Sequence, residues 1–236
     1  MSVDILRHCP LFTGLKEDDL KRVRALASLK RAAKGQIIFS EGEEARGFYV
    51  LLSGKVKIYK VSPDGKEQIL HVVSPPDTFA EAALFLEGSY PAFAEALSDS
   101  QMLFFPKRDF VQLLEKNSQL GINMIVSLSQ FLKRFASLIE ELSLKEVSAR
   151  IAKYLIDLSV KQSKVGATQS REGKGPREVE LDLSKTQLAA KLGTISETLS
   201  RTLAKMRAKG IIDVKGNRIT ILDRQLLEEL ASGLKI

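Results

Sequence analysis

Cysteine is almost missing from this chain of 236 residues, which contains only Cys9. A single thiol excludes an internal disulfide framework and any iron–sulfur or zinc site whose ligands are mainly cysteines of one chain. Long apolar runs are missing too, because an uninterrupted run such as Phe48 to Leu52 is far shorter than a bilayer-spanning helix or the apolar part of a secretion signal. We therefore expect a cytoplasmic protein with no iron–sulfur cluster and no membrane association.

Histidine is scarce as well, since only His8 and His71 occur, 63 positions apart. Metal-dependent oxygenases built on jelly rolls need clustered histidine and carboxylate ligands. The sequence offers no such cluster, so we expect a protein that is not an enzyme and has no catalytic residues.

Positive charge is unevenly distributed along the chain. Residues 1–145 carry 19 Lys/Arg against 18 Asp/Glu, whereas residues 146–236 carry 17 against 11. Within Leu183 to Arg218 there are eight basic and two acidic residues. This local excess suits a polyanionic partner, although a merely solvated basic face has the same composition.

The N-terminal half contains short β-rich runs separated by Gly, Pro and Asp, which are typical of turns. A helix is expected before them, at Lys16 to Leu29, because apolar residues recur there at helical spacing. Many short strands at this spacing predict a sandwich or jelly-roll barrel. The expected strands are Gln36 to Phe39, Phe48 to Leu52, Val56 to Val61, Gln68 to Val73, Ala92 to Leu97 and Met102 to Phe105.

After Pro106 the apolar period becomes helical, and the spacing alternates between three and four residues. A seam of this kind lets two helices pack knobs into holes, so it predicts a dimer contact. The alternative is a helix packed on the barrel of its own chain. The seam residues are Ile125, Leu128, Leu132, Phe135, Ile139 and Leu142.

A further helix is expected at Val147 to Val160. The segment from Lys161 to Glu180 is expected to be a flexible surface loop, because it combines Gly, Ser and Pro with charged residues. Two helices with a tight turn at Gly193 follow. Ser184 is the predicted N-cap of the first helix and Ser196 that of the second, and Gly210 ends the pair. This spacing predicts a helix-turn-helix whose second helix enters the major groove of DNA.

The residues that read DNA are expected on the outward side of this second helix. Arg201 can donate two hydrogen bonds to guanine, Glu197 can accept from cytosine, and Ser196 and Ser200 can serve several base edges. Glu197 can also simply stabilise the dipole of the helix. Strands at Ile211 to Val214 and Arg218 to Leu222 add a wing, and the candidate phosphate contacts are Lys185, Lys191, Lys205, Lys215 and Arg218.

These patterns predict an α+β protein with an N-terminal β-roll, a long dimerisation helix and a C-terminal winged helix-turn-helix. The expected boundaries are 1–116, 117–145 and 146–236. Double-stranded DNA and a second copy of the chain are the expected partners, and RNA polymerase is a further one. A regulatory nucleotide-binding module without DNA binding is the other possibility, but it leaves the winged motif unused.

Several segments resemble the CRP/FNR family of bacterial transcription regulators. They are Leu11 to Leu15, Gly47 to Leu70, Pro75 to Phe85, Ala149 to Leu155 and Ile195 to Ile212, and together they span most of the chain. The motif ETLSR at Glu197 to Arg201 is similar to the recognition helix of the FNR branch, which implies a TTGA-type half-site in an inverted repeat.

The cAMP-binding signature of the family is broken here. Its Glu81 is present, but the preceding glycine is Ala80, the phosphate-binding Arg-Ser pair falls at Pro91-Ala92, and the adenine-contacting Thr-Ser pair falls near Phe135-Ala136. A cyclic phosphate would lose its charge-assisted hydrogen bonds at such a site. We therefore do not expect this chain to bind cAMP.

The sequence motifs TFAEA and YPAFAEA resemble those of one subgroup of the family, the nitrate respiration and hybrid-cluster-protein regulators, which sense nitric oxide through haem. This resemblance implies haem b in an apolar slot, with His71 as an axial ligand and His8, Cys9 or Met124 as a second one. A small organic effector is the alternative. The expected lining of the effector pocket is Leu70, Val72, Phe79, Glu81, Phe85 and Phe93.

Overall fold

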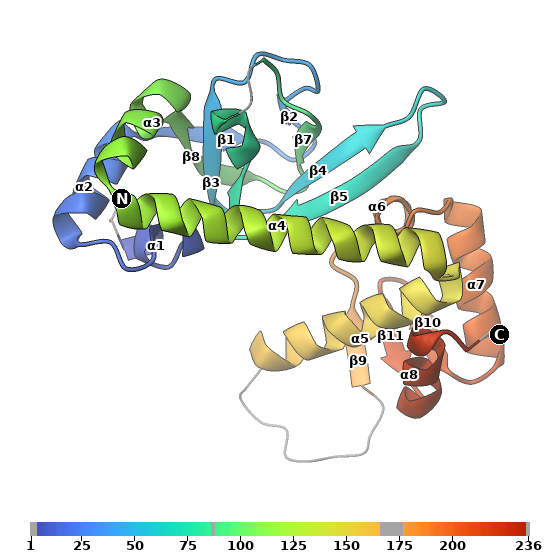
Figure 1. The fold of residues 1–236 in the computed structure, drawn as a ribbon. Coiled ribbons are helices and arrows are strands. Elements are labelled where there is room, and N and C mark those ends of the chain that lie inside the picture. Colours follow the sequence, from blue (N-terminus) through green and yellow to red (C-terminus); the bar gives the residue numbers. More distant parts are fainter. Residues whose placement is uncertain (1–3, 86–87, 166–176, 235–236) are drawn as a thin grey trace. The chain divides into compact units, whose positions relative to one another are not determined.

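The computed structural model describes residues 4–85, 88–165 and 177–234 (Figure 1). The chain divides into two compact units, Met1–Ala136 and Ser137–Ile236. None of the helices in the described part has the length and apolar character that crossing a membrane requires.

The first unit is built on two four-stranded sheets in which neighbouring strands are antiparallel. In their spatial order, one sheet contains β1 (Ser28–Ala32), β8 (Ser100–Pro106), β3 (Gly47–Ser53) and β6 (Thr78–Phe79), and the other contains β2 (Ile37–Phe39), β7 (Phe93–Ala96), β4 (Val56–Val61) and β5 (Glu67–Val73). Short helices surround them: α1 (Asp4–Arg7), η1 (Pro10–Phe12), α2 (Glu17–Leu26), η2 (Glu81–Leu84) and α3 (Lys107–Lys116).

Two apolar clusters hold this unit together, and both arise because alternate strand residues point to the same side. The first joins the helices to β3 and β8, and in it the rings of Phe48 and Phe105 stack at 4.9 Å while Phe110 meets Phe48 edge-on. The second includes Phe39, Phe79 and neighbouring residues of both sheets. Fully buried rings of this size contribute most of the apolar area that stabilises such a core.

All six expected strands are present, but the sequence did not indicate β1 and β6. The expected helix at Lys16 to Leu29 is too long, because α2 ends at Leu26 and the chain enters β1 at Ser28. Strand β1 is an edge strand whose first four residues are exposed, so it has no apolar alternation to reveal it.

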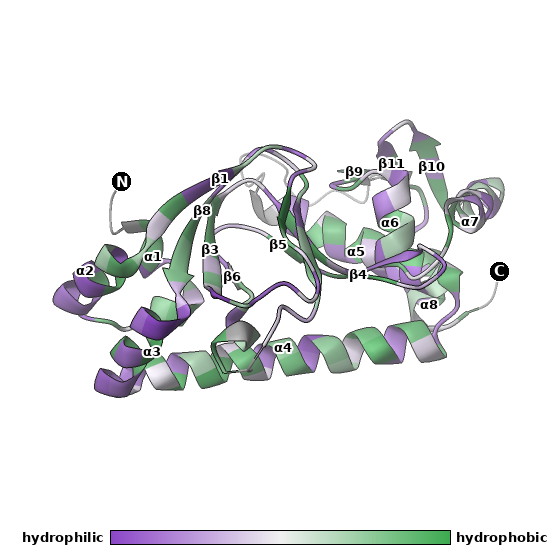
Figure 2. Ribbon diagram, turned by 90° about the horizontal axis from the view of Figure 1, so that it is seen from above, coloured by the Kyte–Doolittle hydropathy of each residue, from purple (hydrophilic) through white to green (hydrophobic). Residues whose placement is uncertain are grey.

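Helix α4 (Ser118–Leu144) follows α3 and nearly matches the expected range 117–145. Hydrophobic residues recur along its whole length (Figure 2). The boundary between the two compact units falls within this helix, at Ala136 and Ser137.

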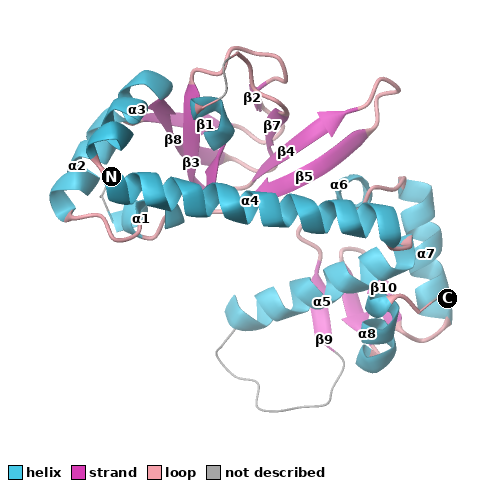
Figure 3. Cartoon of the chain, in the orientation of Figure 1, coloured by secondary structure: helices cyan, strands magenta, loops and turns pink. Residues whose placement is uncertain are grey.

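The second unit contains α5 (Val147–Val165), β9 (Arg177–Glu180), α6 (Lys185–Lys191), α7 (Ser196–Ala208), β10 (Ile212–Lys215), β11 (Arg218–Ile221) and α8 (Arg224–Ser232) (Figure 3). Helix α5 packs against α8, β9 and α7. The strands form a three-stranded antiparallel sheet in the order β10-β11-β9.

The prediction of a loop from Lys161 to Glu180 is wrong at both ends of this range. Helix α5 continues to Val165, and Arg177–Glu180 is a strand paired with β11. The side chain of Gln162 bonds both the N–H and the carbonyl oxygen of Glu180, which ties the helix to this strand. Residues 166–176 of the expected loop lie outside the described residues.

Candidate nucleic-acid interface and ligand pocket

Helix α6 begins with a complete capping box. The Ser184 hydroxyl accepts from the Gln187 N–H at 3.3 Å, and the Gln187 side chain accepts from the Ser184 N–H at 3.0 Å. After Lys191 the chain turns through Gly193, whose φ of +61° is accessible to glycine at little cost. Six residues further on, Leu199 is fully buried, which fixes how α7 lies against α6.

Helix α7 has one buried and one exposed face. Leu199, Leu203 and Met206 are buried at helical spacing. The four residues expected to read base edges are all exposed, and together they line one shallow surface depression: Ser196, Glu197, Ser200 and Arg201. The structure therefore brings these predicted residues onto one surface at the N-terminal end of the helix.

The predicted N-cap of α7 is wrong. Ile195 occupies that position and makes no side-chain cap, and Ser196 is the first helical residue. Its hydroxyl is therefore not used as the cap acceptor, and it lies beside Glu197 in the exposed depression.

The candidate phosphate contacts are spread over α6, α7 and the β10–β11 hairpin. The Lys191 Nζ lies 4.9 Å from the centre of the Tyr154 ring, a cation–π distance. Lys215 lies 3.9 Å from Asp213, and Arg218 lies 3.4 Å from Glu178. Because all four of these charged side chains are at least partly exposed, such pairs are weak and can exchange for phosphate contacts. Lys185 and Lys205 are exposed as well.

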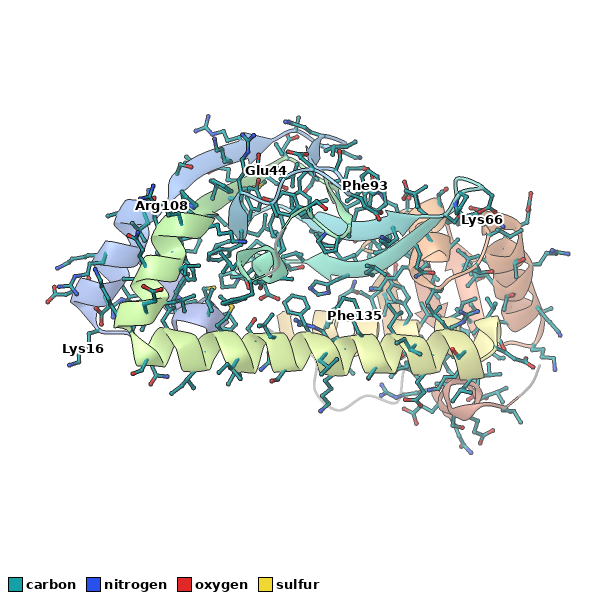
Figure 4. The ribbon with its side chains drawn as sticks, turned by 45° about the horizontal axis from the view of Figure 1, so that its top comes forward. Lys16, Glu44, Lys66, Phe93, Arg108 and Phe135 are labelled. Carbon is teal, nitrogen blue, oxygen red and sulfur yellow. The ribbon has the colours of Figure 1, made fainter. Side chains whose placement is uncertain are left out.

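A cavity of about 450 Å³ lies in the first unit between the strands and α4. Its walls are mainly apolar, and Phe135 of α4 projects into the region beside the strands (Figure 4). The lining consists of Phe39, Ile58, Leu70, His71, Phe79, Ala80, Glu81, Ala82, Tyr90, Pro91, Ala92, Leu128, Phe131, Leu132 and Phe135. The described lining contains no lysine or arginine.

Three side chains in this mainly apolar lining are polar, namely Glu81, His71 and Tyr90. Glu81 is only 2% exposed, and burial raises its pKa to about 7, although the Thr78 hydroxyl donates a hydrogen bond to its carboxyl group and so favours the charged form. The His71 ring meets the Phe131 ring edge-on at 5.7 Å. The Tyr90 hydroxyl donates to the Gly47 carbonyl oxygen at 2.9 Å.

Three of the six residues expected to line the effector pocket line this cavity. Leu70, Phe79 and Glu81 line the cavity, and so does His71. Phe85 is 55% exposed, and Phe93 instead stacks on Tyr59 at 5.3 Å, since it lies on the other side of β7 from the buried Ala94.

Val72 is likewise absent from the lining. A bulge in β5 opposite Ile58 and Tyr59 brings Leu70 and His71, which are consecutive, to the cavity, and normal alternation then turns Val72 away. No pattern in the sequence marks this bulge.

The other expected axial ligands lie elsewhere. His8 is exposed, whereas Cys9 and Met124 are buried in the cluster around Phe48 and Phe105. Burial raises the pKa of Cys9 to about 12, so its thiol stays protonated. Within residues 4–85, 88–165 and 177–234, no three His, Cys, Asp or Glu side chains gather closely enough to hold a metal ion.

Helix α4 divides its apolar residues between this cavity and the exterior. Leu128, Leu132 and Phe135, which were expected in the dimer seam, line the cavity of their own chain, together with Phe131. The sequence left both uses open, as a dimer seam or as a helix packed on its own barrel, because either role requires apolar residues at helical spacing. The large apolar side chains of α4 that are exposed are Ile122, Ile125, Val126, Leu132, Phe135, Ile139 and Leu144.

Comparisons with known proteins match both units. A model of the cyclic nucleotide-binding domain matches residues 29–117, and a model of the Crp-like helix-turn-helix domain matches residues 149–230. The fumarate and nitrate reduction regulatory protein of Vibrio cholerae is 32% identical over 228 residues, which cover 96% of this chain and 88% of that protein. The cyclic AMP receptor protein of Thermus thermophilus is 27% identical over 229 residues, covering 97% and 100%.

A solved structure agrees with these matches. A transcriptional regulator of the CRP family from Thermus thermophilus is similar with a TM-score of 0.66 at 30% identity, over 87% of this chain and 98% of that one. The similarity extends over both compact units, so it concerns their order along the chain as well as each fold.

Proposed function

Because this chain belongs to the CRP/FNR family of DNA-binding transcription regulators, we propose that it acts as a homodimer on an inverted repeat of TTGA-type half-sites, under the control of a small molecule held in the cavity of the first unit. One observation carries the DNA part of this proposal. Ser196, Glu197, Ser200 and Arg201 are exposed together on one surface of α7.

The chemistry of that surface suits a half-site containing a G·C pair. Arg201 presents two donors for guanine O6 and N7, and Glu197 presents an acceptor for the amino group of cytosine. A carboxylate near phosphates is unfavourable unless it makes such a contact, so Glu197 favours specific over non-specific binding. In a mobility-shift assay we expect tight binding to a TTGA inverted repeat and weak binding to a shuffled duplex; equal binding of both would contradict the proposal.

Helix α4 supports the homodimer. Ile125, Leu132 and Ile139 recur every seven residues and are between 65% and 72% exposed. Large apolar side chains exposed at this spacing form a stripe that a second α4 can cover in knobs-into-holes fashion.

The same helix supports control by the cavity. Leu132 and Phe135 line the cavity and are also exposed, so an occupant of the cavity would contact a side chain of the proposed dimer stripe and one beside it. A molecule that prefers one packing of α4 would thereby favour one arrangement of the two recognition helices.

The lining favours an uncharged or apolar effector over a cyclic nucleotide. Pro91 and Ala92 lie in the lining where cAMP-binding relatives carry the Arg-Ser pair, and neither side chain can bond a phosphate. The buried Glu81 would repel an anion in its charged form.

Haem b is the candidate with a specific ligand, and its two anionic propionates would have to point out of the cavity into solvent, because the described lining contains Glu81 and no lysine or arginine. His71 lies in the lining, within walls that are otherwise mainly apolar, and its imidazole would hold the iron. When bound, haem would supply a site for nitric oxide. This chain's own residues would orient the group through His71 and exclude water through Phe79, Phe131 and their neighbours.

The haem proposal is tested by absorption spectra of the purified protein after haem addition. We expect a shifted Soret band that is lost in His71→Ala and kept in His8→Ala, whose side chain lies outside the cavity. An unshifted band in the wild type would contradict haem binding and favour a small organic effector, whereas a shift that survives His71→Ala would contradict His71 as the ligand.

A further inference from the structure

An exposed isoleucine stands at the tip of the recognition helix. Ile195 is 45% exposed, and it directly precedes the four residues of the α7 depression. Its backbone is extended, with φ of −99° and ψ of 156°, and its carbonyl oxygen accepts from the Leu199 N–H at 3.0 Å.

Neither local folding nor the core explains an isoleucine at this position. Ile195 is the N-cap of α7, where Ser, Thr, Asp and Asn are preferred because their side chains can bond the first free N–H groups, and where isoleucine is among the poorest choices. The core beneath α7 is supplied by Leu199, Leu203 and Met206, all of which are buried. Almost half of the Ile195 surface thus stays in water in the free chain, where it gains little hydrophobic stabilisation.

We propose that Ile195 is a specificity-determining residue whose side chain packs against the C5-methyl group of a thymine in each half-site. This inference rests on the proposed binding of a TTGA-type repeat. A recognition helix inserts its N-terminal residues first, which brings the N-cap next to the base edges. The methyl group of thymine is the one apolar feature of the major groove, and apolar side chains read it by contact.

The polar neighbours of Ile195 do not account for recognition of the thymine methyl group. Glu197 and Arg201 bond cytosine and guanine, so they read the G·C pair of the half-site. In the major groove thymine differs from cytosine by its O4 acceptor and its C5-methyl group, and the methyl group is the feature that an apolar side chain reads. Ile195 is the exposed large hydrophobic residue that the described part of α7 and its N-cap offers for that contact.

The inference is tested by replacing each thymine of the two half-sites with deoxyuridine, which removes the methyl group and keeps the base pair. With the full-length protein we expect one thymine position per half-site at which the replacement weakens binding about fourfold, as expected for one methyl group, or about fifteenfold when both half-sites are replaced. In Ile195→Ala this dependence disappears, and in Ile195→Val it is retained. Leu222→Ala, which truncates a 52% exposed residue after β11, leaves it unchanged.

The outcomes separate this inference from the proposed function. Wild-type protein that binds the repeat tightly with equal affinity for thymine and deoxyuridine at every position would overturn the inference alone. The inference also fails, with the half-site intact, if Ile195→Ala weakens binding but keeps the full deoxyuridine effect. A wild-type protein that does not distinguish the TTGA repeat from a shuffled duplex would overturn the proposed half-site, and this inference with it.

Discussion

At the scale of single residues, the buried carboxyl group of Glu81 links stability to pH. Its folded-state pKa of about 7 lies above the ordinary value of 4.5, mainly because burial disfavours the charged form. The folded state therefore holds this proton more tightly than the unfolded chain does between about pH 4.5 and pH 7. Linkage then requires the free energy of unfolding to fall as the pH rises through this window, and to level off above it.

We predict that Glu81→Gln removes this part of the pH dependence. Since each pH unit is worth about 1.4 kcal/mol for one proton, the wild type should lose roughly 3 kcal/mol between pH 4.5 and pH 7 that the variant does not lose. Urea unfolding of both proteins across this range measures the difference. Glu44→Gln, at an exposed carboxylate, should behave like the wild type; parallel profiles for Glu81→Gln and the wild type would refute the assignment.

The residues expected to line the pocket show which side-chain positions the sequence could predict and which it could not. Leu70 and Phe79 could be expected in the pocket from the strand pattern, because strand residues alternate between faces. Glu81 lies in η2 and was expected there only from the resemblance to the family's cAMP-binding signature. Phe85 and Phe93 could not be excluded, since their exposure and their stacking depend on which face of the sheet is covered. The bulge that brings both Leu70 and His71 to the cavity is a matter of backbone pairing, which no side-chain pattern reports.

At the scale of elements, the two helices of the DNA-binding motif begin differently. We predict that Ser184→Ala destabilises the protein by about 1 kcal/mol, because it removes the hydroxyl that accepts from the Gln187 N–H. Ser196→Ala is the matched control and should change stability by less than about 0.5 kcal/mol, since Ser196 is exposed and does not cap α7. Chemical denaturation measures both, and equal losses would contradict this description of the helix starts.

Variants on α7 and on the β10–β11 hairpin should affect DNA binding in different ways, because α7 is proposed to contact bases and the hairpin to contact phosphates. We predict that Arg201→Ala on α7 costs roughly 1 to 3 kcal/mol of binding and relaxes the preference at one base position. Lys215→Ala on the β10–β11 hairpin should weaken binding to all sequences alike and lower the salt dependence by about one ion. Titrations on specific and random duplexes at several salt concentrations measure both effects. An equal loss on the two duplexes for Arg201→Ala would remove its role in base reading.

Elements with a clear apolar period were predictable, and the others were not. The helices α4, α6 and α7 and the strands β3, β4 and β5 carry enough apolar residues to show their period. Strand β9 was missed because it is short and follows a stretch rich in Gly and charge, and its place is fixed by pairing with β11. The N-cap of α7 was missed because Ser196 has the better capping chemistry but lies one residue inside the helix.

At the scale of the whole molecule, the proposal depends on α4 joining two copies of the chain. We predict that Ile139→Asp, which places a charge in the exposed apolar stripe, shifts the protein from dimer to monomer. Ile37→Asp is a matched control, because Ile37 is 49% exposed on β2, away from α4. Sedimentation analysis should show a dimer for the wild type and for the control, and a dimeric Ile139→Asp would rule out this stripe as the contact.

The order of β-sheet unit, long helix and winged helix-turn-helix was predictable from sequence because each part carries its own local pattern. The division of α4 between cavity and exterior was not, since Leu128, Leu132 and Phe135 fit a dimer seam and a pocket wall equally well by spacing. Which side chains meet in a cavity depends on contacts between residues far apart in the chain, such as Phe39 with Phe79 and Tyr90.

The central claim, that a pair of recognition helices reads an inverted repeat, is tested most directly by titrating this protein against two labelled duplexes. One carries the intact TTGA inverted repeat, and in the other one half-site is shuffled. The account predicts two chains bound per intact repeat, and a loss of affinity of about a hundredfold or more when one half-site is shuffled. Equal affinity for the two duplexes, or one chain bound to the intact repeat, would contradict it.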